Sequence, residues 1–378
     1  MKKAFAVIGS WGFGNGPKGL TVYKYDSATG QLTDPVRYDE TVSAGHQCYD
    51  PKQKILYVAD EVDNHPGEAG GGGYVRAYRV EEETGQLSFI NEVCVLMTKP
   101  AYLALDSSGG YLLAACHTGR GYVTKVVHDA QGNWTSAVYY DDAGVVLVRI
   151  NEDGSLGPVC DVAVHAGLTR NKKQVHAHPH SVVGSPDGQV YFACDKGLDR
   201  IYSYRINREE GKLIPLTVSE MPFGTAPRYS AFHPNLPVWY ENNEGDDRVY
   251  AFGYDAATGA LKILSTVNLS KGDESANASP SDITVHPNGR FLYAASRGLS
   301  SITVCAIDEC GGITYLESVD SVFPVRGFCI SPDGRYLLAA CEGKNLVKIF
   351  SIREDGRLSD TDREYPADGA ANVQIIEV

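Results

Sequence analysis

The sequence has little that would divide it, anchor it in a membrane or bind it to a metal. No Ser/Gln/Pro-rich stretch or block of like charges marks a linker, and no apolar run approaches the length of a transmembrane helix. The nine cysteines form no Cys-x-x-Cys pair and no short metal-ligand spacing. Several stand inside apolar runs, which is typical of buried thiols in a reduced protein, so we expect a cytoplasmic location.

Positive charge is also scarce. Among 378 residues, 34 are Lys or Arg and 47 are Asp or Glu, which gives a formal net charge of -13. Nucleic acids and anionic membranes require a basic surface, so we expect neither as a partner. A small anionic ligand stays open, because a few local arginines can dominate one pocket.

What the sequence does contain is one unit repeated along its length. β-Branched and aromatic runs between Gly, Pro, Asn and Asp predict four short strands in each unit. A closing turn such as Thr-Gly or Asp-Gly occurs seven times, and a turn followed by an apolar second strand occurs six times. The six copies are Pro51–Asp60, Ser107–Cys116, Pro186–Asp195, Pro234–Asn243, Pro287–Ser296 and Pro332–Cys341.

The two ends of the chain complement each other. The first strand, Ala4–Ile8, stands partway through a unit, and Ala371–Ile376 is a single strand after the last unit. This strand can complete the first unit and close a ring. The pattern therefore predicts an all-β fold, a seven-bladed β-propeller of four-stranded antiparallel blades, with residues 1–378 as a single domain. A sandwich or solenoid is the alternative, although a solenoid needs atypical caps.

Two units carry insertions. The second is lengthened at Asn64–Gly73 and the third at about Arg120–Gly144. Loops of this kind can be inserted between strands without disturbing a blade, so we expect them on one face of the propeller. There they either line or cover a pocket, or have no function.

The topology predicts which residues share one end of the central channel. In an up-and-down blade, the start of the innermost strand and the end of the second strand emerge on the same face. Six residues before the turn proline, or before Ser107 in the third unit, which aligns with that proline, the units present Gly45, Ala101, His180, Arg228, Ser281 and Arg326. Directly after the second strand they present Glu61, His117, Lys196, Glu244, Arg297 and Glu342.

These two rings are charged although the strand interiors are apolar. Channel mouths are wet, and solvent exposure explains any single polar residue there equally well. It explains less well a cationic pocket with one carboxylate and one imidazole. Arginines bind carboxylate or phosphate and stabilise developing negative charge, and His or Glu can move a proton or activate water. Opening or closing an oxygen ester on an anionic substrate needs these groups and no metal or other cofactor.

A histidine-rich string offers a metal site as the competing interpretation. His176, His178 and His180 would point the same way on a strand, and imidazole is a common metal ligand. No Cys or acidic residue follows at a familiar spacing, and Pro179 interrupts a regular strand. We therefore expect His180 to be a channel-facing acid or base and no metal to bind. The absence of a Gly-x-Ser-x-Gly elbow disfavours a serine hydrolase.

Several strings, taken in order from one end of the chain to the other, are specific enough to indicate a family. They are His178–Val183 with Ser185–Gly188, Ala226–Pro234, Asn243–Glu244, Pro287–Gly298, and Val325–Phe328 with Ser331–Leu337. In these strings the chain resembles the lactonase-type seven-bladed propellers, which include bacterial 6-phosphogluconolactonase and fungal 3-carboxy-cis,cis-muconate cyclase.

The resemblance implies an active site at the residues that the two rings select. Its catalytic residues would be His180, Glu244, Arg228 and Arg297. Arg326 matches a further arginine of the family and would face the same pocket. We expect the remaining substrate contacts from Tyr229, His178, Lys196 and His117. Many relatives have His where this chain has Tyr229, and tyrosine can donate a hydrogen bond but is no base near neutral pH.

Three functions follow in order of preference. The first is metal-independent hydrolysis of an anionic sugar-acid lactone, with His180 or Glu244 as the base. The second is cycloisomerisation of a muconate-type dicarboxylate to a lactone. The third is a non-catalytic propeller that serves as a binding platform. The expected partner is a small anionic lactone or dicarboxylate, and the protein itself is expected to be a monomer or a weak homo-oligomer.

Overall fold

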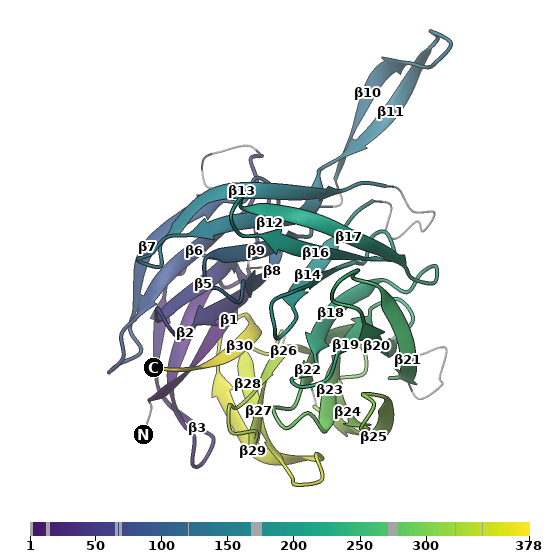
Figure 1. Cartoon of the computed structure of the whole chain (residues 1–378). Coiled ribbons are helices and arrows are strands. Elements are labelled where there is room, and N and C mark those ends of the chain that lie inside the picture. Colours follow the sequence, from purple (N-terminus) through teal and green to yellow (C-terminus); the bar gives the residue numbers. More distant parts are fainter. Residues whose placement is uncertain are drawn as a thin grey trace.

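The protein folds as a ring of seven blades around a central channel (Figure 1). The computed structural model describes residues 3–12, 16–64, 67, 70–119, 121–167, 176–270, 279–321, 323–341 and 343–378. Glu342 of the second ring and Arg120 of the third-unit insertion lie outside these residues. In the described part, no helix is long and apolar enough to cross a membrane.

Each blade is a four-stranded antiparallel sheet whose strands follow one another from the channel outward. Blade 1 consists of β30 (Ala370–Glu377), β1 (Ala4–Ser10), β2 (Gly19–Asp26) and β3 (Gln31–Tyr38). Blade 2 consists of β4 (Ala44–Asp50), β5 (Ile55–Asp60), β6 (Tyr74–Val80) and β7 (Leu87–Cys94). Blade 3 consists of β8 (Pro100–Leu105), β9 (Tyr111–Cys116), β12 (Ala143–Ile150) and β13 (Leu156–His165).

The remaining four blades follow the same order without interruption. Blade 4 consists of β14 (Pro179–Gly184), β15 (Tyr191–Asp195), β16 (Arg200–Asn207) and β17 (Lys212–Glu220). Blade 5 consists of β18 (Pro227–Phe232), β19 (Val238–Asn243), β20 (Arg248–Tyr254) and β21 (Leu261–Asn268). Blade 6 consists of β22 (Pro280–Val285), β23 (Phe291–Ser296), β24 (Ser301–Ile307) and β25 (Ile313–Asp320). Blade 7 consists of β26 (Val325–Ile330), β27 (Tyr336–Cys341), β28 (Leu346–Ile352) and β29 (Leu358–Pro366).

The ring closes by pairing the two ends of the chain. β30 lies antiparallel to β1, with Ala4 opposite Glu377 and Ile8 opposite Val373. β30 therefore supplies the innermost strand of blade 1, and it also contacts the innermost strands of blades 2 and 7. The predicted fold and its closure by the C-terminal strand are confirmed.

The core lies in layers between neighbouring blades, and this placement explains the apolar second strands. Side chains of β5 alternate between the two sides of the blade: Leu56 and Val58 pack toward blade 1, whereas Tyr57 and Ala59 pack toward blade 3. Because both faces of the strand are covered, all six residues of β5 are buried. The sequence accordingly shows a continuous apolar run instead of alternation.

Second-strand tyrosines also bind the blades to one another. The hydroxyl groups of Tyr57, Tyr240 and Tyr293 each donate a hydrogen bond to the closing-turn glycine carbonyl of the next blade, at 2.9, 3.0 and 2.7 Å. All three side chains are fully buried. Each bond satisfies a carbonyl that would otherwise be desolvated without a partner.

Every innermost strand begins with a break in register. Pairing with the second strand passes from Pro179 directly to Ser181, and from Pro227 directly to Tyr229. The same irregularity occurs at the matching position of the other five blades. A bulged residue is released from the ladder and its side chain is redirected. The residue released in blade 4 is His180 and the one in blade 5 is Arg228.

The insertion in the third unit differs from the expected loop. Residues 122–140 form a β-hairpin of β10 (Tyr122–His128) and β11 (Trp134–Tyr140), which projects from the body of the propeller (Figure 1). A turn with Asp129 and Gly132 joins two runs of β-branched and aromatic residues, which is a hairpin pattern.

The nine cysteines are all free.

Candidate active site

The described members of the two predicted rings meet at one end of the channel. The first ring consists of the second residue of each innermost strand, which is the bulged position. The second ring follows the last residue of each second strand. Ring contacts and ion pairs connect the two rings across blades 3 to 6, and a second group of contacts connects blade 7 with blades 1 and 2.

The centre of the site is Glu244. Its Oε2 accepts a hydrogen bond of 2.9 Å from Nζ of Lys196 and lies 3.3 Å from Nε of Arg228. Its Oε1 accepts a hydrogen bond of 3.1 Å from Nη2 of Arg297. Three cations from blades 4, 5 and 6 thus surround one carboxylate.

This arrangement changes the proton affinity of each group. Burial alone would raise the pKa of Glu244, but attraction to Lys196, Arg228 and Arg297 outweighs burial and holds that pKa well below its usual range. Burial lowers the pKa of Lys196 to about 8 and that of Arg228 to about 10, although Glu244 acts in the opposite direction on both. Glu244 is therefore a strong anchor for the cations and a weak base.

Histidine rings form a stack next to these cations. The centroid of the His117 ring lies 4.7 Å from that of His178 and 4.9 Å from that of His180. Nδ1 of His178 lies 2.7 Å from the carbonyl oxygen of His117. On the outer side, the His176 ring lies between those of His178 and Tyr140, with its centroid 4.3 Å from each, and it is stacked on Tyr140. The stack runs from the base of the hairpin to the channel.

His180 is the member of this stack that reaches the cations. It is only 6% exposed, and its Nδ1 is buried without a hydrogen-bond partner in the described part of the chain. Burial, followed by repulsion from Arg228 and His117, lowers the pKa of His180 well below its ordinary value. The imidazole is therefore neutral at neutral pH and can accept a proton or a hydrogen bond.

A buried aspartate holds the segments that carry these groups. Oδ1 of Asp195 accepts hydrogen bonds from the backbone N–H groups of His178 and Gly197, at 2.8 and 3.0 Å. The backbone N–H of Lys196 donates to the carbonyl of His178 at 3.2 Å. The histidine string and the Lys196 turn are thus fixed to each other.

Aromatic side chains form the wall below the mouth. Tyr229 lies 5.3 Å from His180 and 5.0 Å from Tyr102, measured between ring centroids. The ring of Tyr102 stacks on His46 at 3.8 Å. The guanidinium of Arg228 lies 4.4 Å from the centre of the Tyr229 ring. Burial raises the pKa of Tyr229 to about 12, so it can donate a hydrogen bond but not act as a base.

On the opposite side of the mouth, Arg326 contacts a residue that the repeat pattern did not indicate. Its guanidinium lies 3.6 Å from the ring centre of Trp11, and its Nη2 lies 3.9 Å from Oε2 of Glu61. Trp11 directly follows β1 and is thus the second-ring residue of blade 1. Gly45 leaves the space that Glu61 fills, because a Cβ there would meet the Glu61 carboxylate at 2.0 Å.

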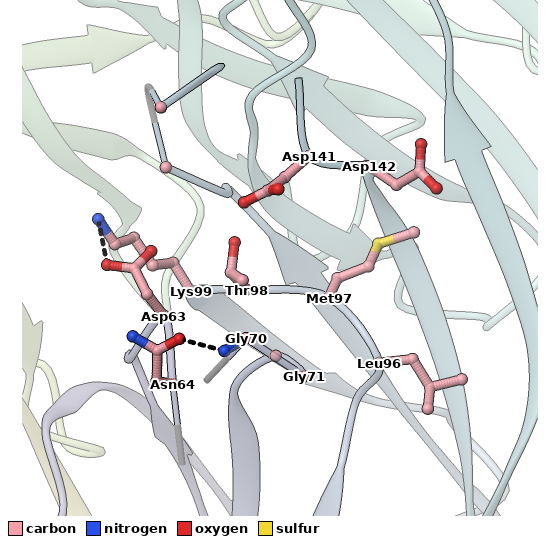
Figure 2. A pocket seen from close by; sticks show the side chains of 13 residues that line it. Asp63, Asn64, Gly70, Gly71, Leu96, Met97, Thr98, Lys99, Asp141 and Asp142 are labelled. Atoms are coloured by element: carbon pink, nitrogen blue, oxygen red, sulfur yellow. Dashed lines mark hydrogen bonds and ion pairs between the residues drawn. The ribbon is translucent and has the colours of Figure 1, made fainter. Parts of the chain in front are cut away.

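A separate pocket of about 550 Å³ is lined by residues of the second and third units (Figure 2). It is lined by Gly70 to Gly72 of the second-unit insertion, one of the two outcomes expected for that loop. Asp63, Asp141 and Asp142 also line it, and Lys99 pairs with Asp63 at 3.2 Å. This acidic lining does not suit an anionic ligand. Within the described ranges, no group of three or more His, Cys, Asp or Glu side chains is arranged to hold a metal ion.

Residues 5–375 match the family described as "Lactonase, 7-bladed beta-propeller". The chain belongs to this family. Among curated lactonase relatives, the 6-phosphogluconolactonase of Bacillus subtilis is 26% identical over 342 residues, which cover 88% of each chain. The 6-phosphogluconolactonase of Formosa agariphila is 25% identical over 303 residues, covering 78% of this chain and 76% of the relative.

Solved structures agree with the family in fold. A periplasmic gluconolactonase of Pseudomonas aeruginosa superposes with a TM-score of 0.85 and 25% identity over 99% of both chains. A protein from Lactobacillus plantarum superposes with a TM-score of 0.83 at 20% identity, covering 99% of this chain and 100% of the other. The second likeness concerns the fold alone.

Proposed function

We propose that this member of the lactonase family hydrolyses an anionic sugar-acid lactone of the 6-phosphogluconolactone type. The observation that carries the proposal is Glu244 ion-paired with cations from three blades, next to the neutral and partly unsatisfied His180. The curated relatives support the substrate class through their names.

The cations supply affinity and transition-state stabilisation. Lys196, Arg228 and Arg297 share the single negative charge of Glu244, so they keep an excess of positive charge toward the channel. This excess attracts an anionic substrate group. Hydrogen-bond donors aimed at a developing oxyanion lower the barrier to ester hydrolysis, because they are already oriented before the reaction.

His180 is the better base of the two candidates. Glu244 is ionised, but its electron pairs are engaged by three cations. His180 has a buried nitrogen without a partner in the described residues. Its imidazole would take a proton from water as the water oxygen attacks the lactone carbonyl carbon. The same proton would then go to the ring oxygen as the carbon–oxygen bond breaks, which yields the free hydroxy acid.

Substrate charge would itself activate this base. Repulsion from Arg228 and Lys196 contributes to the low pKa of His180, after the larger effect of burial. An anion bound among these cations offsets their charge and raises the pKa of His180. The base would thus become effective when an anionic lactone is in place.

Proton release from lactones tests the proposal. The wild-type protein should hydrolyse 6-phosphogluconolactone faster than unphosphorylated gluconolactone, and a chelator should not change the rate. His180→Gln should remain folded and lose turnover, whereas Glu220→Gln, at an exposed ion pair with Arg200, should retain it.

The alternatives give different results in the same assay. The absence of turnover on any lactone would overturn the proposal. Cyclisation of a muconate dicarboxylate by the wild-type protein would then assign the same residues to a cycloisomerase. Failure with both substrate classes would leave the propeller as a binding platform.

A further inference from the structure

The hairpin of β10 and β11 exposes apolar side chains on an element that stands apart from the body (Figure 1). Tyr122 is 65% exposed, Val126 is 73% exposed and Trp134 is 72% exposed. Among the strands that the structure describes, β10 and β11 pair only with each other. A two-stranded hairpin alone is marginally stable in water. These features indicate a surface that is covered by a partner.

The two edges of the hairpin differ in charge: the edge strand β10 carries a lysine that disfavours pairing with another strand, whereas β11 carries no charge. β10 carries Lys125 at its centre, with Nζ 4.9 Å from the ring centre of Tyr139. β11 has the sequence WTSAVYY and contains no charge, proline or glycine. Exposed edge strands normally carry lysine, proline or a bulge, because an unprotected edge pairs with another strand. The edge of β11 is thus the one that is open to pairing.

We propose that β11 pairs antiparallel with β11 of a second copy of this chain. A two-fold axis through Ala137 places Trp134 of each copy opposite Tyr140 of the other, and Ser136 opposite Val138. Each pair lies on one face, because side chains alternate along a strand. Aromatic cross-strand pairs stabilise a sheet, and no like charges meet. The same pairing through β10 would bring two Lys125 side chains together.

Charge favours this element over the bodies as the place where two copies meet. Two copies with a net charge of -13 each repel one another when their bodies come close. The uncharged edge of β11 allows contact while the bodies stay apart, since seven strand residues span about 24 Å. The result is an isologous dimer with a four-stranded sheet, β10–β11–β11–β10, between two propellers.

The pairing would also bring the second copy close to the histidine stack. Tyr140 is stacked on His176 at 4.3 Å, and the His176 ring contacts the His178 ring at the same centroid distance. Trp134 of the second copy, opposite Tyr140, would therefore lie at the outer end of the row of ring contacts that runs from Tyr140 through the histidines to His180.

Sedimentation velocity tests the proposal on the full-length chain. The wild-type protein should form dimers as its concentration rises from about 1 to about 100 µM, the range of a micromolar dissociation constant. Ser136→Lys should weaken dimerisation at least about 10-fold. Each new lysine would lie opposite Val138 of the other copy and diagonally across from the other copy's new lysine, so that like charges meet. Thr124→Lys places the same charge on the same face of β10 and should leave dimerisation unchanged.

A cross-linking variant supplies a test that does not disrupt the arm. Residues on the two-fold axis are close enough for a disulfide. Ala137→Cys should therefore cross-link under mild oxidation beyond the background of the wild-type cysteines. A monomeric wild-type protein would overturn the proposal. A dimer that only Thr124→Lys weakens would also overturn it, because such a dimer pairs through β10. A dimer that neither substitution weakens would overturn it as well, because it uses another surface.

Discussion

Nε of Arg228 lies 3.3 Å from Oε2 of Glu244, within a single blade. Arg228 occupies the bulge at the start of β18 and Glu244 follows β19, so the pair links the two rings inside one repeating unit. Arg228 is 1% exposed and also donates to the carbonyl of Ser281 in the next blade. Glu244 compensates a charge that is otherwise buried. It is therefore a positioning residue for the cations around it.

The first prediction separates this positioning role from that of the base. His180→Gln should lower kcat by about 10²- to 10⁴-fold with little change in KM, which is typical of losing a general base. Glu244→Gln should raise KM as well as lower kcat, because Lys196 and Arg297 lose their anchor. Steady-state kinetics on 6-phosphogluconolactone measures both. If Glu244→Gln lowers kcat alone while His180→Gln stays active, the roles are reversed.

The second prediction concerns the acid side of the pH profile. His180 must be neutral to accept a proton, and burial, followed by repulsion from Arg228, holds its pKa below 6.5. As pH falls through 6.5, the free enzyme thus keeps its base, and kcat/KM should decline only at more acidic values. The acidic decline of kcat should occur at a higher pH than that of kcat/KM. The bound anion offsets the positive charge of the cations and thereby raises the pKa of His180 in the complex. A decline of kcat/KM at or above pH 6.5 would contradict this assignment.

The third prediction concerns the alkaline side. Burial lowers the pKa of Lys196 to about 8, so its positive charge is lost as pH rises through about 8. KM for an anionic lactone should therefore increase there, after subtraction of spontaneous hydrolysis. Lys196→Arg should abolish this increase, because a guanidinium stays protonated. Lys212→Arg, at an exposed ion pair with Asp161, is the matched control and should behave as the wild type.

The fourth prediction concerns the tyrosines between blades. Tyr293→Phe removes the hydroxyl that donates to the Gly356 carbonyl at 2.7 Å and leaves that oxygen buried without this donor. The free energy of unfolding should fall by about 1–2 kcal/mol, measured by urea denaturation. Tyr122→Phe, on the exposed face of the hairpin, should not change it. Equal urea midpoints for the two variants would show that the bond contributes nothing.

The blades and most of the mouth could be predicted because one strand is buried on both faces in every repeat. That requirement produces an apolar run long enough to align, as in Pro287–Ser296 and Pro332–Cys341. Once the repeats are aligned, Arg228 and Glu244 follow from their places within the unit. Their roles stay predictions, since proximity alone does not identify a base.

The residues that could not be predicted depend on contacts between distant parts of the chain. Blade 1 is divided between the two ends of the chain, so its second ring position, Trp11, has no complete unit in which to be recognised. The buried pair of His165 and Asp195, 2.8 Å apart, joins a fourth strand to the second strand of the next blade. No spacing in the sequence indicates it. The hairpin did carry a local signal in the turn at Asp129.

Closure of the ring by β30 has a consequence for the order in which the protein is made. β1 is the first described strand to leave the ribosome, and its inner neighbour β30 is the last. During synthesis β1 therefore presents an open edge on its channel side, at which a nascent chain can pair with another strand and aggregate. The mouth, to which Trp11 and Arg326 both belong, is completed only when the two ends meet. The proposed lactonase activity should thus arise only after β30 has been synthesised, in one step with its pairing to β1.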